Sequence, residues 1–93
     1  MSFTISYHET VVKQDIPKLS KSDREQIRHA IETKLTESPE VFGKPLRRSL
    51  KGYRKLRVGD YRVIFRIEGS IVKILVIQHR SVVYKKTDQR LAA

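Results

Sequence analysis

The chain has 93 residues, of which 39% are hydrophobic, so it fits a single domain over residues 1–93 with one small core. Its 20 Lys and Arg outnumber its 10 Asp and Glu, and the net charge of +10 favours an anionic partner: nucleic acid, an anionic membrane or an acidic protein. The absence of cysteine excludes disulfides, thiol catalysis and cysteine-ligated zinc, and it fits a cytoplasmic protein.

The first predicted elements are a strand and a short helix. Residues 3–7 alternate apolar and polar side chains, as a half-buried strand does. The same stretch lacks the basic segment and apolar run of a signal peptide. Residues 8–16 predict a helix that Pro17 limits. Its apolar stripe is expected to consist of Val12, Ile16 and Leu19.

A second helix should run from about residue 23 to residue 37. A hydroxyl followed three residues later by a carboxylate, Ser22 and Glu25, fits a capping box at its start, and Ser38-Pro39 ends it. Its apolar face consists of Ile27, Ala30, Ile31 and Leu35. The two helices are therefore expected to form a hairpin whose apolar side packs on a sheet.

The second half of the chain predicts a loop followed by strands. Residues 40–45 are typical of a loop, and residues 46–50 of a short strand that carries Arg47 and Arg48, with Lys51 just beyond. Three longer strands follow, at residues 53–58, 61–67 and 71–78. The last is apolar on both faces apart from one lysine, which is typical of an inner strand. No apolar run approaches the ~20 residues that span a bilayer, so no membrane association is expected.

Taken in order, these elements predict an α+β fold. An N-terminal strand, a two-helix hairpin and an antiparallel meander of three to four strands would place the helices on one face of the sheet. Residues 82–91 fit either a last helical turn or irregular chain. The other face of the sheet would remain open for function.

The turn at Gly59-Asp60 joins the first two long strands into a hairpin. In the register that this turn favours, Arg57 lies opposite Arg62, and Lys55 points to the same side. Like charges placed cross-strand destabilise a sheet, so a fold that retains them is expected to use this surface for an anionic partner. The opposite side of the hairpin is apolar and can cover a core: Leu56, Val58, Tyr61, Val63, Phe65 and Ile67.

A second turn, at Gly69-Ser70, extends this register to the last strand. It places Arg62 opposite Ile77, and His79 then points to the same face as Arg62. Arg80 would point to the opposite face unless a β-bulge resets the alternation. A cluster of cations and a histidine is thus expected on one face of the sheet.

Such a cluster suits the cleavage of RNA by its own 2′-hydroxyl. The protein must hold the scissile phosphate, stabilise added negative charge, accept one proton and donate another. Crowding of like charges favours the neutral form of a lysine, so Lys55 is the candidate base, with His79 or Tyr84 as the candidate acid. A solvated charged face without such a role is the plainer interpretation. No metal or cofactor is expected, because neither metal-ligand spacing nor a glycine-rich phosphate loop occurs in the sequence.

Two segments, LKGYRKLRVGDYR at residues 50–62 and HRSVVY at residues 79–84, resemble the RelE/ParE superfamily of bacterial toxins. The resemblance extends over nearly the whole chain and implies the toxin of a type II toxin–antitoxin pair. RelE members cleave mRNA in the ribosomal A site without a metal, leaving a 2′,3′-cyclic phosphate. A small acidic, RelB-like antitoxin blocks the toxin, and the complex binds operator DNA and represses its own operon.

By position, the resemblance implies a catalytic role for Lys55, phosphate binding for Arg62, and proton transfer or base stacking for Tyr84. A further family arginine, near the end of the last long strand, falls on His79 or Arg80.

RelE itself has a second catalytic lysine where this chain has Tyr53, and Arg54 or Arg57 could replace its charge. The expected RNA-binding residues are therefore Arg47, Arg48, Lys51, Arg54 and Arg57.

Two other functions stay open. ParE toxins share the fold and poison DNA gyrase instead of cutting RNA, although the retained basic residues and Tyr84 favour cleavage. A non-catalytic RNA-binding protein is the other alternative.

Overall fold

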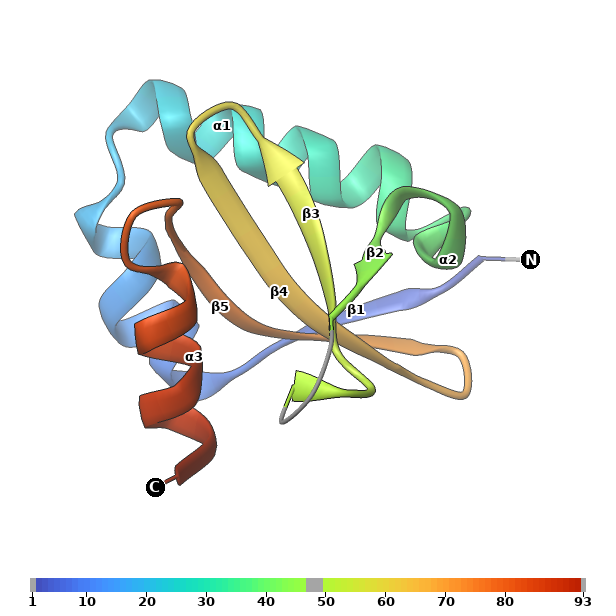
Figure 1. The fold of residues 1–93 in the computed structure, drawn as a ribbon. Helices are drawn as coiled ribbons and strands as arrows, with labels where there is room; N and C mark the ends of the chain where they lie inside the picture. The colour runs from blue at the N-terminus through green and yellow to red at the C-terminus, as the bar shows by residue number, and fades with distance from the viewer. Residues whose placement is uncertain (1, 47–49, 93) are drawn as a thin grey trace.

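The computed structural model describes residues 2–46 and 50–92. A five-stranded sheet in the order β1-β5-β4-β3-β2 forms its centre, with helices packed against it (Figure 1). β1 runs parallel to β5, and the other neighbouring strands are antiparallel. The strands are β1 (Thr4–Tyr7), β2 (Lys44–Pro45), β3 (Arg54–Val58), β4 (Tyr61–Glu68) and β5 (Ile71–His79).

The helical segments follow the predicted order, with one addition that the sequence did not predict and a helix in the tail, which the sequence leaves open. They are η1 (Val11–Asp15), η2 (Ile16–Lys18), α1 (Lys21–Ala30), η3 (Ile31–Leu35), α2 (Pro39–Phe42) and α3 (Val83–Ala92). The α+β class, the N-terminal strand, the helical hairpin and the antiparallel meander are thereby confirmed. α2 replaces a predicted loop, and α3 occupies the tail. Nowhere in the described ranges is a helix both long and apolar enough to cross a membrane.

The first helical segment buries a different valine from the one predicted. Val12 is 53% exposed, whereas Val11 is fully buried. η1 is a π-helical turn, which is wider than an α-helical turn and shifts the residues that face the core. The predicted stripe is therefore wrong at Val12.

The second helix begins two residues earlier than predicted. Ser20, with extended backbone, is the N-cap, and its hydroxyl accepts a hydrogen bond from the backbone N–H of Asp23 at 3.1 Å. The capping box predicted at Ser22 is therefore wrong. α1 then continues through the π-helical turn η3, so that one helical rod spans residues 21–35.

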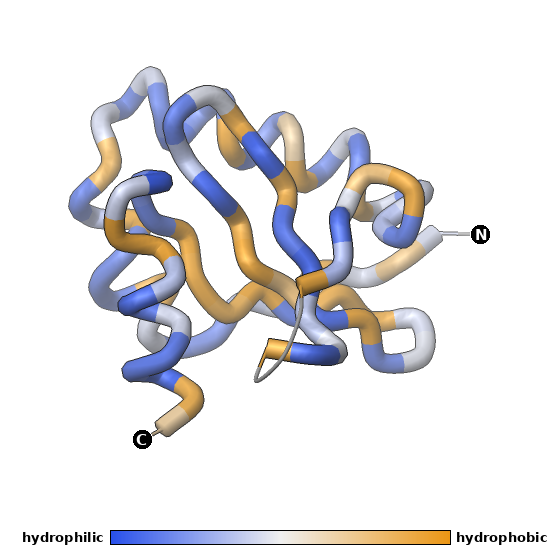
Figure 2. The backbone as a smooth tube through the Cα atoms, in the orientation of Figure 1, coloured by the Kyte–Doolittle hydropathy of each residue, from blue (hydrophilic) through white to orange (hydrophobic). Residues whose placement is uncertain are grey.

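The main core lies between this helical rod and the sheet. Figure 2 shows hydrophilic residues near the β3–β4 turn and hydrophobic residues further along β4 and β5. The predicted apolar side of the β3–β4 hairpin faces the rod, which confirms that orientation. The buried residues of this core are Val11, Leu19, Ile27, Ala30, Ile31, Leu35, Leu56, Val58, Val63, Phe65, Val72, Ile74 and Ile77.

A second, smaller core covers part of the opposite face. Val83 of α3 packs on Ile64 and Val76, so α3 and α1 lie on different sides of the sheet (Figure 1). The two predicted helices do share one face, but α3 adds a helix to the other. The part of that face toward β3 and β2 remains open for function.

A buried carboxylate fixes α3 to the edge of β5. Asp15 is 1% exposed, and its carboxylate accepts hydrogen bonds from the backbone N–H of Ile77 at 2.9 Å and from Gln78 at 2.7 Å. Arg90 of α3 donates to the same carboxylate at 2.6 Å and to the carbonyl of Leu75 at 2.9 Å. β1 pairs with β5 only as far as Ile74, so these side chains satisfy the strand edge that β1 leaves open.

Candidate functional site

The predicted register of the first hairpin is confirmed. Arg57 pairs with Arg62, and Lys55 pairs with Ile64. Because Ile64 belongs to the core under α3, all three basic side chains emerge on the α3 side of the sheet. Arg57 is exposed, while Lys55 and Arg62 are half-buried.

The predicted place of His79 is wrong, because β5 contains a bulge. Ile64 pairs with Val76 and Phe65 with Ile74, so Leu75 is an extra residue in β5. Beyond the bulge the alternation is reversed, and Arg62 pairs with Gln78 instead of Ile77.

His79 accordingly pairs with Tyr61 and points to the α1 side. Its ring meets the Tyr61 ring edge to face, with centroids 5.7 Å apart, and Nδ1 lies 2.8 Å from the Ser81 hydroxyl. Arg80 follows the strand beside the β3–β4 turn, where its Nε lies 3.9 Å from the carboxylate of Asp60. Neither residue lines the hollows that surround Lys55.

Five basic residues surround a hollow of about 280 Å³ at the β2–β3 edge of the sheet. We call this set the basic groove: Lys34, Lys44, Lys55, Arg57 and Arg62. The other two lining residues are Leu56 and Phe42, so the lining contains no acidic side chain. A site of one charge sign attracts anions and raises their local concentration.

Lys44 and Lys34 were missed by sequence reasoning. Lys44 pairs directly with Lys55, but β2 has only two residues and ends in Pro45, so no alternation marks it as a strand. Lys34 belongs to η3 and has no sequence signal that separates it from other helix-surface lysines.

Tyr84 reaches the basic groove from α3. Its hydroxyl accepts a hydrogen bond from Nζ of Lys55 at 3.1 Å, and the same amine lies 5.8 Å from the centre of the tyrosine ring. The two residues line a second hollow, of about 470 Å³, together with Lys44, Pro45, Leu46 and Leu50. This contact places Tyr84, a candidate acid, beside Lys55, the candidate base.

Arg62 is held in place by the turn that precedes it. One guanidinium nitrogen donates to the carbonyl oxygens of Gly59 at 3.0 Å and Tyr61 at 2.9 Å. In the part of the chain that the structure describes, no carboxylate forms an ion pair with Lys55, Arg57 or Arg62. The positive charge of these side chains is therefore available to a ligand.

Not every predicted RNA-binding residue joins the groove. Arg54 pairs with Phe65, which turns it to the α1 side, and it donates to the backbone carbonyl of Gly43 at 2.9 Å. Arg54 therefore lies on the opposite side of the sheet from Lys55, and its contact with RNA stays a prediction. Lys51 lies exposed in the turn before β3, outside the lining. Arg47 and Arg48 fall outside the described residues.

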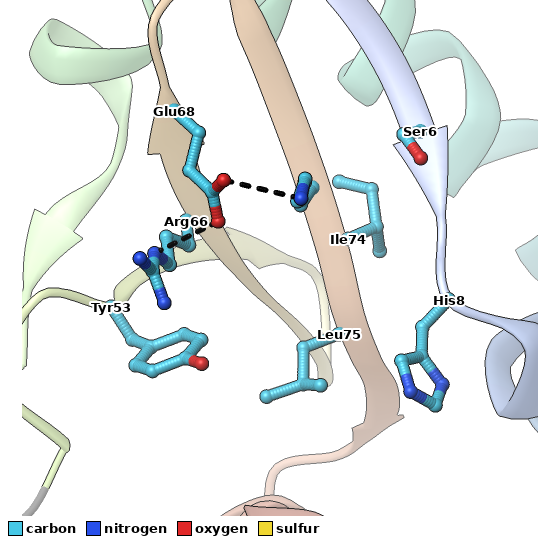
Figure 3. A pocket seen from close by; sticks show the side chains of 8 residues that line it. Ser6, His8, Tyr53, Arg66, Glu68, Ile74 and Leu75 are labelled. Atoms are coloured by element: carbon cyan, nitrogen blue, oxygen red, sulfur yellow. Dashed lines mark ion pairs between the residues drawn. The ribbon is translucent and has the colours of Figure 1, made fainter.

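Another hollow on the α3 side has a carboxylate between its two cations (Figure 3). The carboxylate of Glu68 lies 3.2 Å from Nε of Arg66 and 3.1 Å from Nζ of Lys73. Since its cations already have a carboxylate partner, this hollow is a weaker anion site than the basic groove. Within the described ranges, no three His, Asp or Glu side chains are grouped so that they could hold a metal ion.

Known proteins share both the sequence pattern and the fold. The family described as ParE toxin of type II toxin–antitoxin system, parDE, matches residues 7–84. Toxin RelG of Mycobacterium tuberculosis is 33% identical over 88 residues, which cover 92% of this chain and 100% of that toxin. The chain belongs to the RelE/ParE superfamily of toxins. It is therefore the toxin of a type II toxin–antitoxin system.

Solved structures of RelE toxins have the same architecture. A chain of the toxin–antitoxin complex RelBE2 from M. tuberculosis has a TM-score of 0.80 and 31% identity, over 87% of this toxin and 94% of that chain. A variant of E. coli RelE in the free state has a TM-score of 0.72 at 24% identity, over 97% of this toxin and 98% of that chain. The latter similarity supports the fold alone.

This toxin departs from the RelE pattern at Tyr53. Its side chain packs against the second core, and its ring lies 5.9 Å from the guanidinium of Arg66. Lys44, the cross-strand neighbour of Lys55, brings another amine into the groove instead.

Proposed function

We propose that this toxin inhibits translation as an endoribonuclease that cleaves mRNA on the ribosome. The observation that carries the proposal is the 3.1 Å contact between Lys55 and Tyr84, because it sets two proton-transfer groups beside the cations of the basic groove. Membership of the RelE/ParE superfamily is compatible with this activity.

In the proposed reaction, the groove binds the phosphate that follows the attacked nucleotide. The 2′-oxygen forms a bond to phosphorus as the bond to the 5′-oxygen breaks, which yields a 2′,3′-cyclic phosphate and a new 5′-hydroxyl. One proton leaves the 2′-hydroxyl and one is delivered to the 5′-oxygen, and Lys55 and Tyr84 move them. Arg62, with Arg57, stabilises the negative charge that accumulates on the phosphorane oxygens.

An acidic antitoxin is the proposed partner. Solved relatives are complexes of RelE-type toxins with RelB antitoxins, and the net charge of +10 favours a partner of opposite sign. We propose that the antitoxin folds on the toxin, suppresses its activity and, in the complex, represses their shared operon. Both proteins would act in the cytoplasm.

Expression of the toxin without its antitoxin tests the activity. Mapping of RNA 5′ ends should reveal cuts inside translated messages, in phase with codons. Arg62→Ala should lower the cleavage rate by ~10²–10³, because it removes a preorganised charge from the developing phosphorane.

The matched control is Arg66→Ala, which removes an arginine from the same strand and face but outside the groove, where Glu68 already pairs with it. This variant should cut as the unaltered toxin does. An Arg62→Ala toxin that still cuts messages at the original rate contradicts the role given to Arg62.

Inhibition of DNA gyrase is the second candidate, because the family that matches residues 7–84 is described as ParE toxin. It predicts DNA breaks trapped on gyrase in expressing cells, while messages on ribosomes stay intact. Intact messages together with gyrase-linked breaks would replace the first proposal by the second.

A further inference from the structure

An aromatic side chain stands at the rim of the basic groove, although nothing in the proposed chemistry requires it. Phe42, the last residue of α2, is 45% exposed and lines the same hollow as Lys55, Arg57 and Arg62. The amine of Lys34 lies 5.6 Å from the centre of its ring. An exposed apolar ring among five cations is expected where a ligand has both negative charge, which the cations bind, and an aromatic face, which stacks on the ring.

The position of Phe42 is fixed by the residues around it. A Cβ at Gly43 would lie 2.1 Å from the ring of Phe65, so only glycine lets α2 end this close to the core. Arg54 holds the same end through its hydrogen bond to the Gly43 carbonyl. The backbone that carries the Phe42 ring is therefore held in place before a ligand arrives. The toxin then loses less conformational entropy when a ligand stacks on the ring.

Phe42 and Tyr84 belong to two hollows that share Lys44 and Lys55. Phe42 lines only the first of these hollows and Tyr84 only the second. A path across both therefore runs from one aromatic ring, past the shared lysines, to another. Single-stranded nucleic acid is recognised by this combination, because cations follow its phosphates and aromatic rings stack on its bases.

We propose that Phe42 is a base-stacking subsite for single-stranded RNA, for a nucleotide on the opposite side of the scissile phosphate from the one near Tyr84. The inference rests on the proposed function, since it takes the basic groove to be the RNA path. An uncharged protein segment is the weaker fit, because five of the seven residues lining the hollow are Lys or Arg and such a segment would desolvate their charges without supplying an anion.

A short single-stranded RNA with 2′-O-methyl riboses tests the subsite without cleavage. One base at a time is replaced by 2-aminopurine, whose fluorescence is quenched when it stacks. Phe42→Ala should weaken binding roughly tenfold and abolish the quenching at one position only. Phe42→Trp should restore both. The dependence of affinity on salt should not change, since no charge is removed.

Val41→Ala is the matched control, because Val41 is 75% exposed on the same short helix but does not line the groove. It should bind RNA as the unaltered toxin does. Equal affinity and quenching for Phe42→Ala and Val41→Ala would overturn the inference and leave the ring to a protein contact.

The outcome also separates the subsite from the proposed function. RNA binding that depends on Arg62 but not on Phe42 removes the subsite alone. If the unaltered toxin fails to bind the RNA even at low salt, the subsite is overturned, whereas the proposed cleavage on the ribosome is judged by the mapped RNA 5′ ends alone. Quenching that depends on Phe42, in a toxin that never cuts messages in cells, retains the subsite and removes the nuclease.

Discussion

Two cross-strand pairs of like charge, Lys44–Lys55 and Arg57–Arg62, lie close together at the β2–β3 edge of the sheet. Like charges placed directly opposite each other destabilise a sheet. In the described part of the chain, no carboxylate forms an ion pair with Lys55, Arg57 or Arg62. The cost is understandable if these side chains bind an anion, since cations that are already held apart need little rearrangement when it arrives.

Tyr84→Phe separates the hydroxyl from the ring. It removes the hydrogen bond to Lys55 and keeps a surface on which a base can stack. If the hydroxyl moves a proton in the reaction, the cleavage rate should fall by about 10² or more while RNA affinity is unchanged. Single-turnover cleavage of a programmed ribosome, with the affinity measured on uncleavable RNA, distinguishes the two effects.

His79→Ala is the variant to compare with Tyr84→Phe, since both residues are candidate acids. Because the bulge turns His79 to the α1 side, its removal should leave the cleavage rate unchanged. A large loss of rate in His79→Ala, with Tyr84→Phe fully active, would reverse the assignment of the two residues.

At the scale of elements, α3 supplies Tyr84 only because the far end of the helix is fixed. Arg90, in its last turn, bonds to the buried carboxylate of Asp15, and Val83, in its first turn, packs on the second core. We call the contact between Asp15 and Arg90 the clamp. The clamp and the groove are thus at opposite ends of one helix. α2 likewise supplies Phe42 because the end of this helix, at Gly43, is held against the core by the close contact with Phe65 and by Arg54.

Asp15→Ala should lower the free energy of unfolding by about 3–5 kcal/mol, because it leaves Arg90 and the N–H of Ile77 without their buried partner. Urea denaturation measures the loss. Lys13→Ala, which removes an exposed ion pair with Glu9 on the same helical segment, should cost at most ~0.5 kcal/mol. Equal stability of the two variants would show that the clamp contributes little.

At the scale of the whole molecule, positive charge is in excess, and the residues that line the groove include no carboxylate. Glu68 forms ion pairs with two cations in its own hollow, and Asp15 is used inside the fold. The net charge of +10 therefore acts over the groove without a local counter-charge. Long-range attraction of this kind accelerates association more than it slows dissociation.

Association with the acidic antitoxin should consequently slow by tenfold or more as ionic strength rises from low to high, because salt screens the long-range attraction. Stopped-flow mixing measures the association rate, and competition with excess unlabelled toxin measures dissociation. Dissociation should change much less. An association rate that is independent of salt contradicts electrostatic steering.

The hairpin register was predictable because the turn at Gly59-Asp60 and the alternation beside it are local. The bulge at Leu75 was not, because residues 74–77 are all apolar and an extra residue leaves that pattern unchanged. The same limit applies to the valine pair at residues 11–12 and to the choice between Ser20 and Ser22 as the helix cap. In each case two nearby positions have equivalent side chains, so the sequence alone does not show which of them takes the structural role.

The sequence by itself determined the α+β order of elements, the basic character of the molecule and the side of the hairpin on which Lys55, Arg57 and Arg62 emerge. These depend on charge, periodicity and tight turns, which act over a few residues. Only the tertiary structure decided that His79 leaves this cluster and that Tyr84, Lys44 and Phe42 enter or border it. Those placements depend on contacts between segments far apart in the chain, and no local pattern records such contacts.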